Sequence, residues 1–346
     1  MISPPRRLVR RLLLTPIVFV GALVLGILSP AIHLVAAVAD LVFDRRRWRI
    51  SRFVGVGLAF CVVEVVSLCS LLITWVGSGF GRFSHRPRWV EANTQITGRH
   101  LALITHAVRF YLGFSFTYTN EPIPTGPVLL LARHAGPGDA FLIGRVIIRD
   151  GGRRLRIVGS EKLTWDPFLD IAGYRLGFHY LHAERPGDPT NTDQIRDLAE
   201  ELTDGDVLVI FPEGGNYTHR RKQRLLSSLR DRGEHELADR AERLRHTLLP
   251  RPGGVLAALE GCPQLSVLFA AHAGLDALHG FTDLWNAVPL NKEVTAHAWV
   301  TATDSRPTDA AGQTMWLCDQ WEAVDDWIDD ELARTQPSND TPPQGH

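Results

Sequence analysis

Two long apolar segments near the start of the chain constrain its fold more than any other feature. Leu12 to Ala39 carries no charge and is dominated by Leu, Val, Ile and Ala, and Phe53 to Phe80 is interrupted only by Glu64. At about 1.5 Å per residue, a helix of either length covers a hydrocarbon layer about 30 Å thick. The first segment is also too long for a signal peptide, so the sequence predicts an uncleaved pair of membrane helices.

Basic residues flank both apolar segments. Arg clusters lie before, between and after them, within residues 6–11, 45–49 and 82–88. The positive-inside rule would place all three flanks in the cytoplasm, which two full crossings cannot satisfy. Two arrangements stay open: a hairpin that dips into one leaflet, or two crossing helices with a basic external loop. We favour the shallow hairpin, at the cell membrane with the active site facing the cytoplasm.

The charge of the chain is unevenly distributed. Although the 346 residues carry a formal net charge of −1, the first 110 hold 14 Arg and no Lys against 4 acidic residues. Arg beside apolar helices suits contact with anionic lipid head groups, and it suits topology signalling equally well. The basic end of the chain thus coincides with the predicted membrane segments.

The cysteines and histidines point to neither disulfides nor a metal site. Cys61 and Cys69 lie in an apolar segment, and Cys262 and Cys318 are far apart and form no CxxC pair. This usage is typical of a reducing cytoplasmic setting. The histidines show neither HExxH nor Cys/His ligand spacing, so we expect no metal in the chemistry.

After about Gly113, short apolar runs alternate with helical patterns, which indicates a mostly parallel α/β sheet flanked by helices. The predicted strands are Phe114 to Tyr118, Val128 to Ala132, Leu155 to Gly159, Val207 to Phe211, Leu265 to Phe269 and Val294 to Trp299. The predicted helices are Asp139 to Ile148, Thr192 to Leu202, Arg221 to Leu248 and Met315 to Leu332. The chain is thus divided into N-terminal membrane-anchoring helices (1–84), an α/β domain (85–334) and a disordered tail (335–346).

A histidine and a carboxylate follow one buried strand directly. His134 and Asp139 stand five residues apart across a turn rich in Gly and Pro, immediately after Val128 to Ala132. At this spacing the carboxylate can hold one ring nitrogen and leave the other free to accept a proton from a hydroxyl. The plainer alternative is that Asp139 caps the following helix and His134 is a turn residue. In open α/β sheets, ligands bind at such strand ends.

Further motifs follow in a fixed order. Phe211-Pro212-Glu213-Gly214 ends another predicted strand, Lys162 and Arg185 fall before it, and Leu249-Pro250-Arg251 follows a predicted long helix. With these motifs, the chain over roughly residues 85–305 resembles the glycerolipid acyltransferase family typified by 1-acylglycerol-3-phosphate (lysophosphatidate) acyltransferases.

The resemblance implies roles for the two best-matched blocks. His134 would be the general base and Asp139 its orienting carboxylate. Glu213 and Gly214 match the third block, where Glu213 would hydrogen-bond within the site or to the acceptor. Asn216 stands where that family usually has an Arg that contacts the acceptor phosphate. Backbone amides around residues 136–138 or 214–215 would donate to the oxyanion.

Other basic residues are candidates for binding the acceptor. The resemblance aligns Arg185 loosely with the phosphate-binding Arg of the second block and Lys162 with a basic position before it. Arg220 and Arg221 trail the third block, and one of them could replace the missing Arg. Two of them have a plainer alternative: Arg185 as a solvated loop arginine and Lys162 as a structural lysine.

Together these expectations define a function. The resemblance implies a membrane-bound O-acyltransferase that moves a fatty acyl group from acyl-CoA or acyl carrier protein directly to a lysoglycerolipid hydroxyl, most plausibly lysophosphatidate to phosphatidate. It implies no cofactor beyond the acyl donor. The implied partners are membrane lipids and the acyl donor, and no nucleic acid is expected to bind. No Gly-x-Ser-x-Gly elbow is present, consistent with direct transfer. The alternatives are a different lipid or alcohol acceptor, and a non-catalytic membrane lipid-binding protein.

Overall fold

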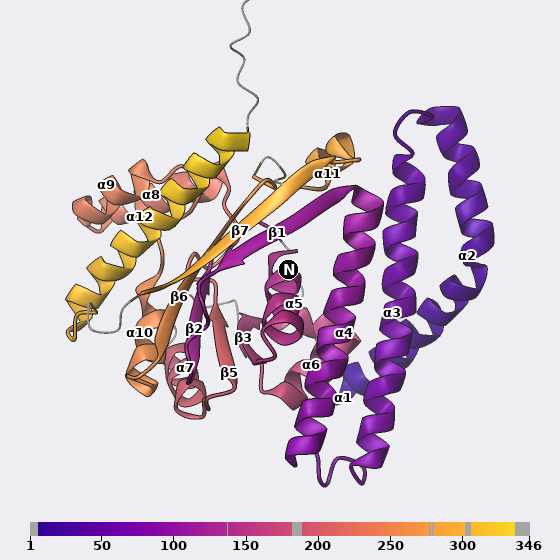
Figure 1. Ribbon diagram of the computed structural model, residues 1–346, viewed down its shortest axis with the longest axis horizontal. Coiled ribbons are helices and arrows are strands. Elements are labelled where there is room, and N and C mark those ends of the chain that lie inside the picture. Colours follow the sequence, from indigo (N-terminus) through magenta and orange to yellow (C-terminus); the bar gives the residue numbers. More distant parts are fainter. Residues whose placement is uncertain are drawn as a thin grey trace, which may run out of the picture.

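A seven-stranded sheet forms the centre of the α/β region (Figure 1), with strand order β1-β7-β6-β2-β5-β3-β4. The computed structural model describes residues 6–136, 138–181, 189–276, 278, 280–301 and 306–335. The strands are β1 (Phe114–Asn120), β2 (Val128–Ala132), β3 (Arg154–Ser160), β4 (His179–Leu181), β5 (Asp206–Ile210), β6 (Ser266–Ala273) and β7 (Lys292–Thr301). Strands β2 to β6 are mutually parallel, whereas β7 is antiparallel to β6 and β1 is parallel to β7. The predicted mostly parallel α/β fold is confirmed.

Alternate side chains of the central strands pack into two separate cores. Leu129 and Leu131 of β2 face one core, and Val128 and Leu130 face the other. The first core is covered by α7 (Pro189–Glu200), α8 (His219–Asp231), α9 (His235–Arg243), α10 (Pro252–Gly261) and α12 (Ala310–Thr335), and the second by α4 (Pro87–Leu112), α5 (Asp139–Arg145) and the π-helical turn η2 (Val146–Asp150). Because both faces are buried, the strands are continuous apolar runs rather than alternating ones.

Some predicted elements differ from those observed. The predicted helix from Arg221 to Leu248 is wrong as a single element: α8 and α9 are separated at Gly233, whose φ of 74° favours glycine, and residues 244–251 are irregular. The prediction missed β4, α4, α10, the 3₁₀ turn η3 (Glu161–Trp165), α6 (Pro167–Leu176) and α11 (Phe281–Ala287). The predicted tail lies outside the described residues except for Thr335, which ends α12. The predicted domain boundaries stay predictions.

The N-terminal segment forms the expected helical hairpin, which stands beside α4 at one flank of the sheet (Figure 1). After a short start, α1 (Arg7–Val9) and the π-helical turn η1 (Arg10–Leu14), it consists of α2 (Thr15–Phe43) and α3 (Arg49–Gly77). Two stretches, Arg7–Ile27 and Arg49–Gly77, are long and apolar enough to cross a bilayer. Only 6% of the apolar window of the first is buried, so its side chains face outward.

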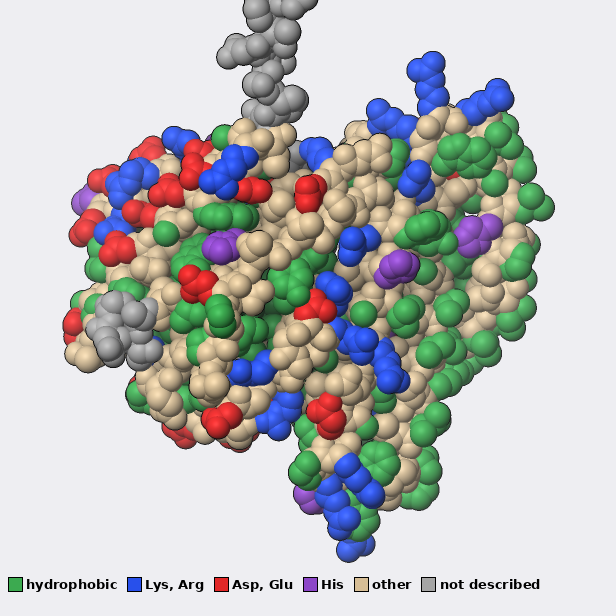
Figure 2. Space-filling view, in the orientation of Figure 1, with side chains coloured by type: hydrophobic (Ala, Val, Ile, Leu, Met, Phe, Trp, Pro, Cys, Tyr) green, Lys and Arg blue, Asp and Glu red, His purple; other side chains and the backbone are tan. Residues whose placement is uncertain are grey.

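The outer flank of this hairpin is largely apolar, and basic side chains gather at both of its ends (Figure 2). The turn between α2 and α3 is organised by two carboxylates. Asp40 accepts hydrogen bonds from the amides of Ile50 and Ser51 at 3.0 and 2.7 Å, and Asp44 accepts from the Arg49 guanidinium at 2.8 Å. The contacts of Asp40 satisfy amides at the start of α3 that have no partner within the helix.

The hairpin contacts the α/β domain near the turn between its helices. Arg49 donates to the carbonyl of Trp285 in α11 at 3.4 Å, and its guanidinium lies 5.3 Å from the Trp285 ring centroid. The ring of Phe53 stacks on the same indole with centroids 5.2 Å apart. The turn end of the hairpin is therefore attached to the domain that carries the sheet.

The opposite end of the hairpin contacts α6. Asp170 accepts from Arg10 at 2.7 Å and from Arg11 at 3.1 Å. Glu64, the one acidic residue in the second apolar segment, is 1% exposed and accepts from the Phe168 amide at 3.0 Å, at the start of α6. A carboxylate within an apolar helix thus faces the protein interior, as expected for such residues.

Candidate active site

The two motif residues predicted to do chemistry lie together at the end of β2. Because β2, β3, β5 and β6 are parallel, the residues that follow each strand meet at one edge of the sheet. His134 follows β2 by two residues, and Asp139 is the first residue of α5. The His134 Nδ1 and Asp139 Oδ2 atoms are 3.1 Å apart, which leaves Nε2 as the ring nitrogen able to accept a proton.

Asp139 is held in place by several contacts. It is 2% exposed, and its Oδ2 atom also accepts from the amide of Gly136 at 2.7 Å. Burial by itself would raise the pKa of Asp139. The charge of His272 and the hydrogen bonds from His134 and the Gly136 amide outweigh burial, so the pKa lies well below its usual range. The carboxylate is therefore ionised at neutral pH and can stabilise a protonated His134.

A second histidine faces the same carboxylate. The Nε2 atom of His272, on β6, lies 3.4 Å from Asp139 Oδ1, within ion-pair range. Ala132 of β2 pairs with Ala270 of β6. His134 and His272 each lie two residues after one of these paired alanines. No role was predicted for His272 from the sequence; the available signal was its position shortly after the predicted strand Leu265 to Phe269, because ligands bind at such strand ends.

Arg133, the residue before His134, is buried behind the site at 2% exposure. Its guanidinium donates to the carbonyls of His272 at 2.6 Å and His246 at 3.0 Å, and it forms an ion pair with Asp276. Arg133 thus links the end of β6 to the segment after α9. The prediction missed this role, since the contacts join residues far apart in sequence.

Glu213 holds the backbone of the site. Its Oε1 atom accepts from the His134 amide and its Oε2 atom from the Leu248 amide, each at 2.9 Å. Burial raises the pKa of Glu213 to about 7, although the two amide hydrogen bonds and the charge of Arg133 favour the ionised form. Both carboxylate oxygens serve protein amides and the residue is 2% exposed, so direct contact with the acceptor stays a prediction.

Gly214 occupies a conformation that favours glycine. Its φ is 68°, and a Cβ atom here would lie about 3.0 Å from the Arg251 guanidinium. Two of the amides expected as oxyanion donors are engaged within the protein: that of Gly136 by Asp139, and that of Gly214 by the carbonyl of Phe211 at 3.1 Å. In this conformation neither is the donor that the sequence analysis expected.

The basic candidates occupy different surroundings. Arg221 lies over the third block: its guanidinium donates to the Asn216 carbonyl at 2.7 Å and also contacts the Asn216 side chain. Arg220 is exposed on α8, and Lys162 is exposed in η3, directly after β3. Arg185 lies outside the described residues. The structure therefore brings Arg221 beside the position of the missing family Arg.

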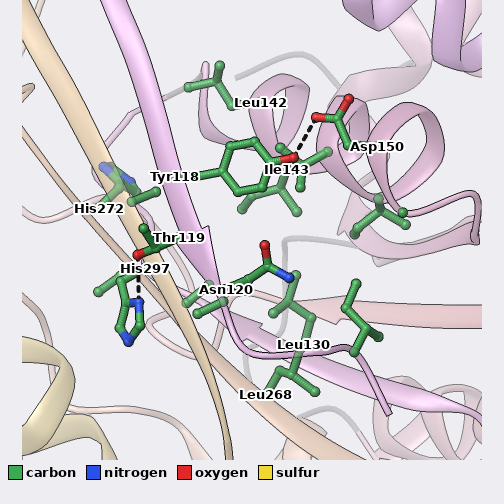
Figure 3. A pocket seen from close by; sticks show the side chains of 18 of the residues that line it. Tyr118, Thr119, Asn120, Leu130, Leu142, Ile143, Asp150, Leu268, His272 and His297 are labelled. Carbon is green, nitrogen blue, oxygen red and sulfur yellow. Dashed lines mark hydrogen bonds between the residues drawn. The ribbon is translucent and has the colours of Figure 1, made fainter. Parts of the chain in front are cut away.

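A cavity of about 160 Å³ adjoins the His134–Asp139 pair. Asp139 and His272 belong to its lining, and most of the remaining surface is apolar, contributed by β2, β6, β7, α5 and η2 (Figure 3). A hydrogen bond of 3.0 Å between Tyr118 and Asp150 lies in its wall. Among its apolar lining residues are Leu130, Leu142, Ile143, Leu268, Ala296 and Ala298. Such a cavity suits a hydrocarbon chain.

Among the residues that the structure describes, no group of three or more His, Cys, Asp or Glu side chains is arranged to hold a metal ion. The pair at the end of β2 is instead arranged to move a proton. A histidine held by a buried carboxylate beside an apolar cavity is an arrangement suited to acyl transfer onto a hydroxyl.

Comparisons with known proteins agree with this class of site. Residues 115–250, which include His134, Asp139 and Glu213, match the family model described as Acyltransferase. The resemblance to the acyltransferase family found in the sequence is confirmed over this segment.

Individual relatives are distant. The crystal structure of the 1-acyl-sn-glycerophosphate (LPA) acyltransferase PlsC from Thermotoga maritima is similar at 12% identity and a TM-score of 0.45, over 78% of this chain and 99% of that one. A comparison with curated proteins gave no match.

Proposed function

We propose that this protein is a membrane-associated O-acyltransferase that transfers a fatty acyl group from an acyl thioester to the hydroxyl of a lysoglycerolipid, with lysophosphatidate as acceptor and phosphatidate as product. The observation that carries the proposal is the 3.1 Å contact between His134 and the buried Asp139, beside an apolar cavity. The acyltransferase domain over residues 115–250 supports the reaction class.

In the proposed reaction His134 is the general base. Its Nε2 atom accepts the hydroxyl proton as the acceptor oxygen attacks the thioester carbonyl and a C–O bond forms. The C–S bond then breaks, and the His134 imidazolium returns the proton to the leaving sulfur, which releases the free thiol carrier. A base positioned in this way contributes roughly 10²- to 10⁴-fold to the rate. Asp139 keeps Nδ1 protonated and stabilises the imidazolium that forms.

The apolar cavity supports a lipid as the substrate. A fatty acyl chain placed there would be removed from water, at about 0.8 kcal/mol per buried CH₂. Because Asp139 and His272 line the same cavity, a chain inside it would bring its carboxyl end close to the base. The choice between acyl-CoA and acyl carrier protein as donor belongs to this proposal and is decided by assay.

The hairpin supports a location at the membrane surface. Its apolar outer flank suits lipid, and both of its ends contact the α/β domain, through Trp285 and through Asp170. A hairpin fixed to one domain at both ends cannot cross the bilayer without drawing the charged flank of that domain into hydrocarbon, which is costly. This geometry supports a hairpin lying in one leaflet. We propose that it lies at the cell membrane, with the active site on the cytoplasmic side.

One assay tests the proposal. Purified protein in vesicles is incubated with acyl-CoA or acylated carrier protein and a panel of lysolipids, and release of the free thiol is followed with a thiol reagent beside a His134→Ala control. We expect release with lysophosphatidate that falls by about 10²-fold or more in the variant. Asn216 stands where Arg is common in the family, which leaves a different lipid or alcohol as the alternative acceptor. Release of the thiol only with such an acceptor would favour this alternative. No release with any donor and acceptor would contradict the enzymatic proposal and favour a lipid-binding protein.

A further inference from the structure

A single carboxylate on the last helix holds the segment that closes the back of the site. Residues 244–251, here called the strap, contain no helix or strand. Asp325 on α12 accepts from the amide of Arg245 at 2.7 Å through Oδ2. Its Oδ1 atom accepts from the amides of His246 and Thr247, each at 2.8 Å, and from the Thr247 hydroxyl at 2.9 Å. Three successive amides thus converge on one carboxylate, which makes an anion-binding concavity of the strap backbone.

The strap in turn contacts the residues that position the base. The carbonyl of His246 accepts from Arg133 at 3.0 Å, and the Leu248 amide donates to Glu213 at 2.9 Å. The other oxygen of Glu213 holds the His134 amide. A continuous series of hydrogen bonds therefore runs from Asp325 through the strap and Glu213 to the backbone of the predicted base.

The contact between Asp325 and the strap is buried, unlike an ordinary surface ion pair. Asp325 is 4% exposed and Thr247 is fully buried. The neighbours of Asp325 on α12, Val324 and Ile328, are also fully buried in the core that includes Phe269 of β6. Helix α12 lies outside the matched family segment of residues 115–250, so the matched domain takes this contact from a separate part of the chain.

From these contacts we propose that Asp325 is a positioning residue of the acyl-transfer site, acting through the strap to fix Glu213 and the His134 backbone. The inference rests on the proposed function for its kinetic consequence. Loss of the carboxylate would leave three strap amides without an acceptor, and the strap would rearrange to satisfy them. Small displacements of a catalytic group reduce turnover steeply while substrate binding can persist.

The test compares Asp325→Ala and Asp325→Asn with Asp326→Asn, which changes an exposed carboxylate on the same helix. Kinetic constants are measured per folded molecule in vesicles, and hydrogen exchange is measured at the Leu248 amide. We expect Asp325→Ala to lower kcat by about 10-fold or more, with KM for both substrates changed by no more than about threefold. Asp325→Asn keeps one acceptor oxygen, so its kcat should lie between the values of wild type and Asp325→Ala. The kinetic constants of Asp326→Asn should match those of wild type.

Hydrogen exchange at the Leu248 amide tests the contact between Asp325 and the strap separately from its effect on turnover. In Asp325→Ala this amide should exchange about 10-fold faster or more, because its strap is released from α12. A folded Asp325→Ala variant with unchanged kcat and a protected Leu248 amide would overturn the proposal. If that variant does not fold, Asp325→Asn and Thr247→Val, which removes only the hydroxyl contact, decide by the same readouts. Inactive wild type would contradict the proposed function alone, because the exchange result still tests the strap.

Discussion

At the scale of single residues, the site depends on carboxylates that hold backbone and ring atoms in place. Asp139 contacts two histidines and an amide, and Glu213 contacts two amides. Each is almost fully buried, so an unpaired amide or oxygen created by mutation would have no water to replace its partner. Their titration therefore affects stability as well as chemistry.

The Glu213→Gln variant should lose a pH dependence of stability. The pKa of Glu213 is raised from 4.5 to about 7 in the folded protein, so between these values the folded state binds more protons than the unfolded state. The stability from this group is complete below pH 4.5 and is lost as the pH rises through about 7. Denaturant titrations should show that, between acidic and mildly alkaline pH, the free energy of unfolding of wild type falls by roughly 1–3 kcal/mol relative to that of the variant. Identical profiles for the two proteins would contradict this assignment.

Arg221→Ala should weaken binding of a phosphate-bearing acceptor. Its guanidinium lies beside Asn216, where the family usually has an Arg, and a charge-assisted contact to phosphate would be lost in both ground and transition states. We expect KM for lysophosphatidate to rise about 10-fold with little change in kcat. Arg220→Ala is the matched control on the same helix, and equal effects of both substitutions would show that Arg221 has no special role.

At the scale of elements, the sheet and its neighbours build the cavity. Strands β6 and β7 are antiparallel, and Ala270 pairs with Ala298 in their register. Small side chains at these positions leave space that α5 and η2 border from the other side. The reversed strands β7 and β1, which follow β6 at one end of the sheet, thus border a space that the parallel strands alone would leave open.

Filling this cavity should change the preferred acyl chain length. Ala298→Leu adds three carbon atoms to the lining, so long chains should lose more turnover than short ones. We expect the ratio of kcat/KM for a long-chain donor to that for a medium-chain donor to fall about 10-fold. Ala310→Leu, at an exposed position at the start of α12, is the control. An unchanged chain-length profile in the Ala298 variant would mean that acyl chains bind elsewhere.

At the scale of the whole molecule, the hairpin and the α/β domain form a continuous unit. Arg175 of α6 donates to the Leu71 carbonyl of α3 at 2.8 Å and to Asn93 of α4 at 3.0 Å. The hairpin is therefore attached to α6, which follows β3 and η3 along the chain. An orientation imposed on the hairpin by lipid would orient the site as well.

A cysteine-accessibility experiment tests the shallow hairpin. The four native cysteines are replaced, and a single cysteine is placed at Arg46, in the hairpin turn, or at Ser227, exposed on α8. If both positions lie on the cytoplasmic side, a membrane-impermeant maleimide should modify each of them only after the cells are permeabilised. Modification of the Arg46 cysteine in intact cells, with the Ser227 cysteine protected, would instead show a crossing pair.

Features that depend on a local pattern could be predicted from the amino-acid sequence. The long apolar helices and the buried strands follow from composition and period, and β2 was predicted at its observed bounds. The placement of His134 and Asp139 after a buried strand also follows from a local pattern, because five residues and a turn suffice to bring the two side chains together. These relationships need no contact between distant parts of the chain.

Only the tertiary structure decided how distant segments complete the site. His272, Arg133 and Asp325 gain their positions from strand pairing and helix packing over separations that no local pattern records. Glu213 was found by its motif, yet its partners, the His134 and Leu248 amides, lie on segments far from it in sequence. The division has a physical reason: local period fixes which residues are buried, whereas buried polar groups take whichever partners the packed chain brings within hydrogen-bond distance.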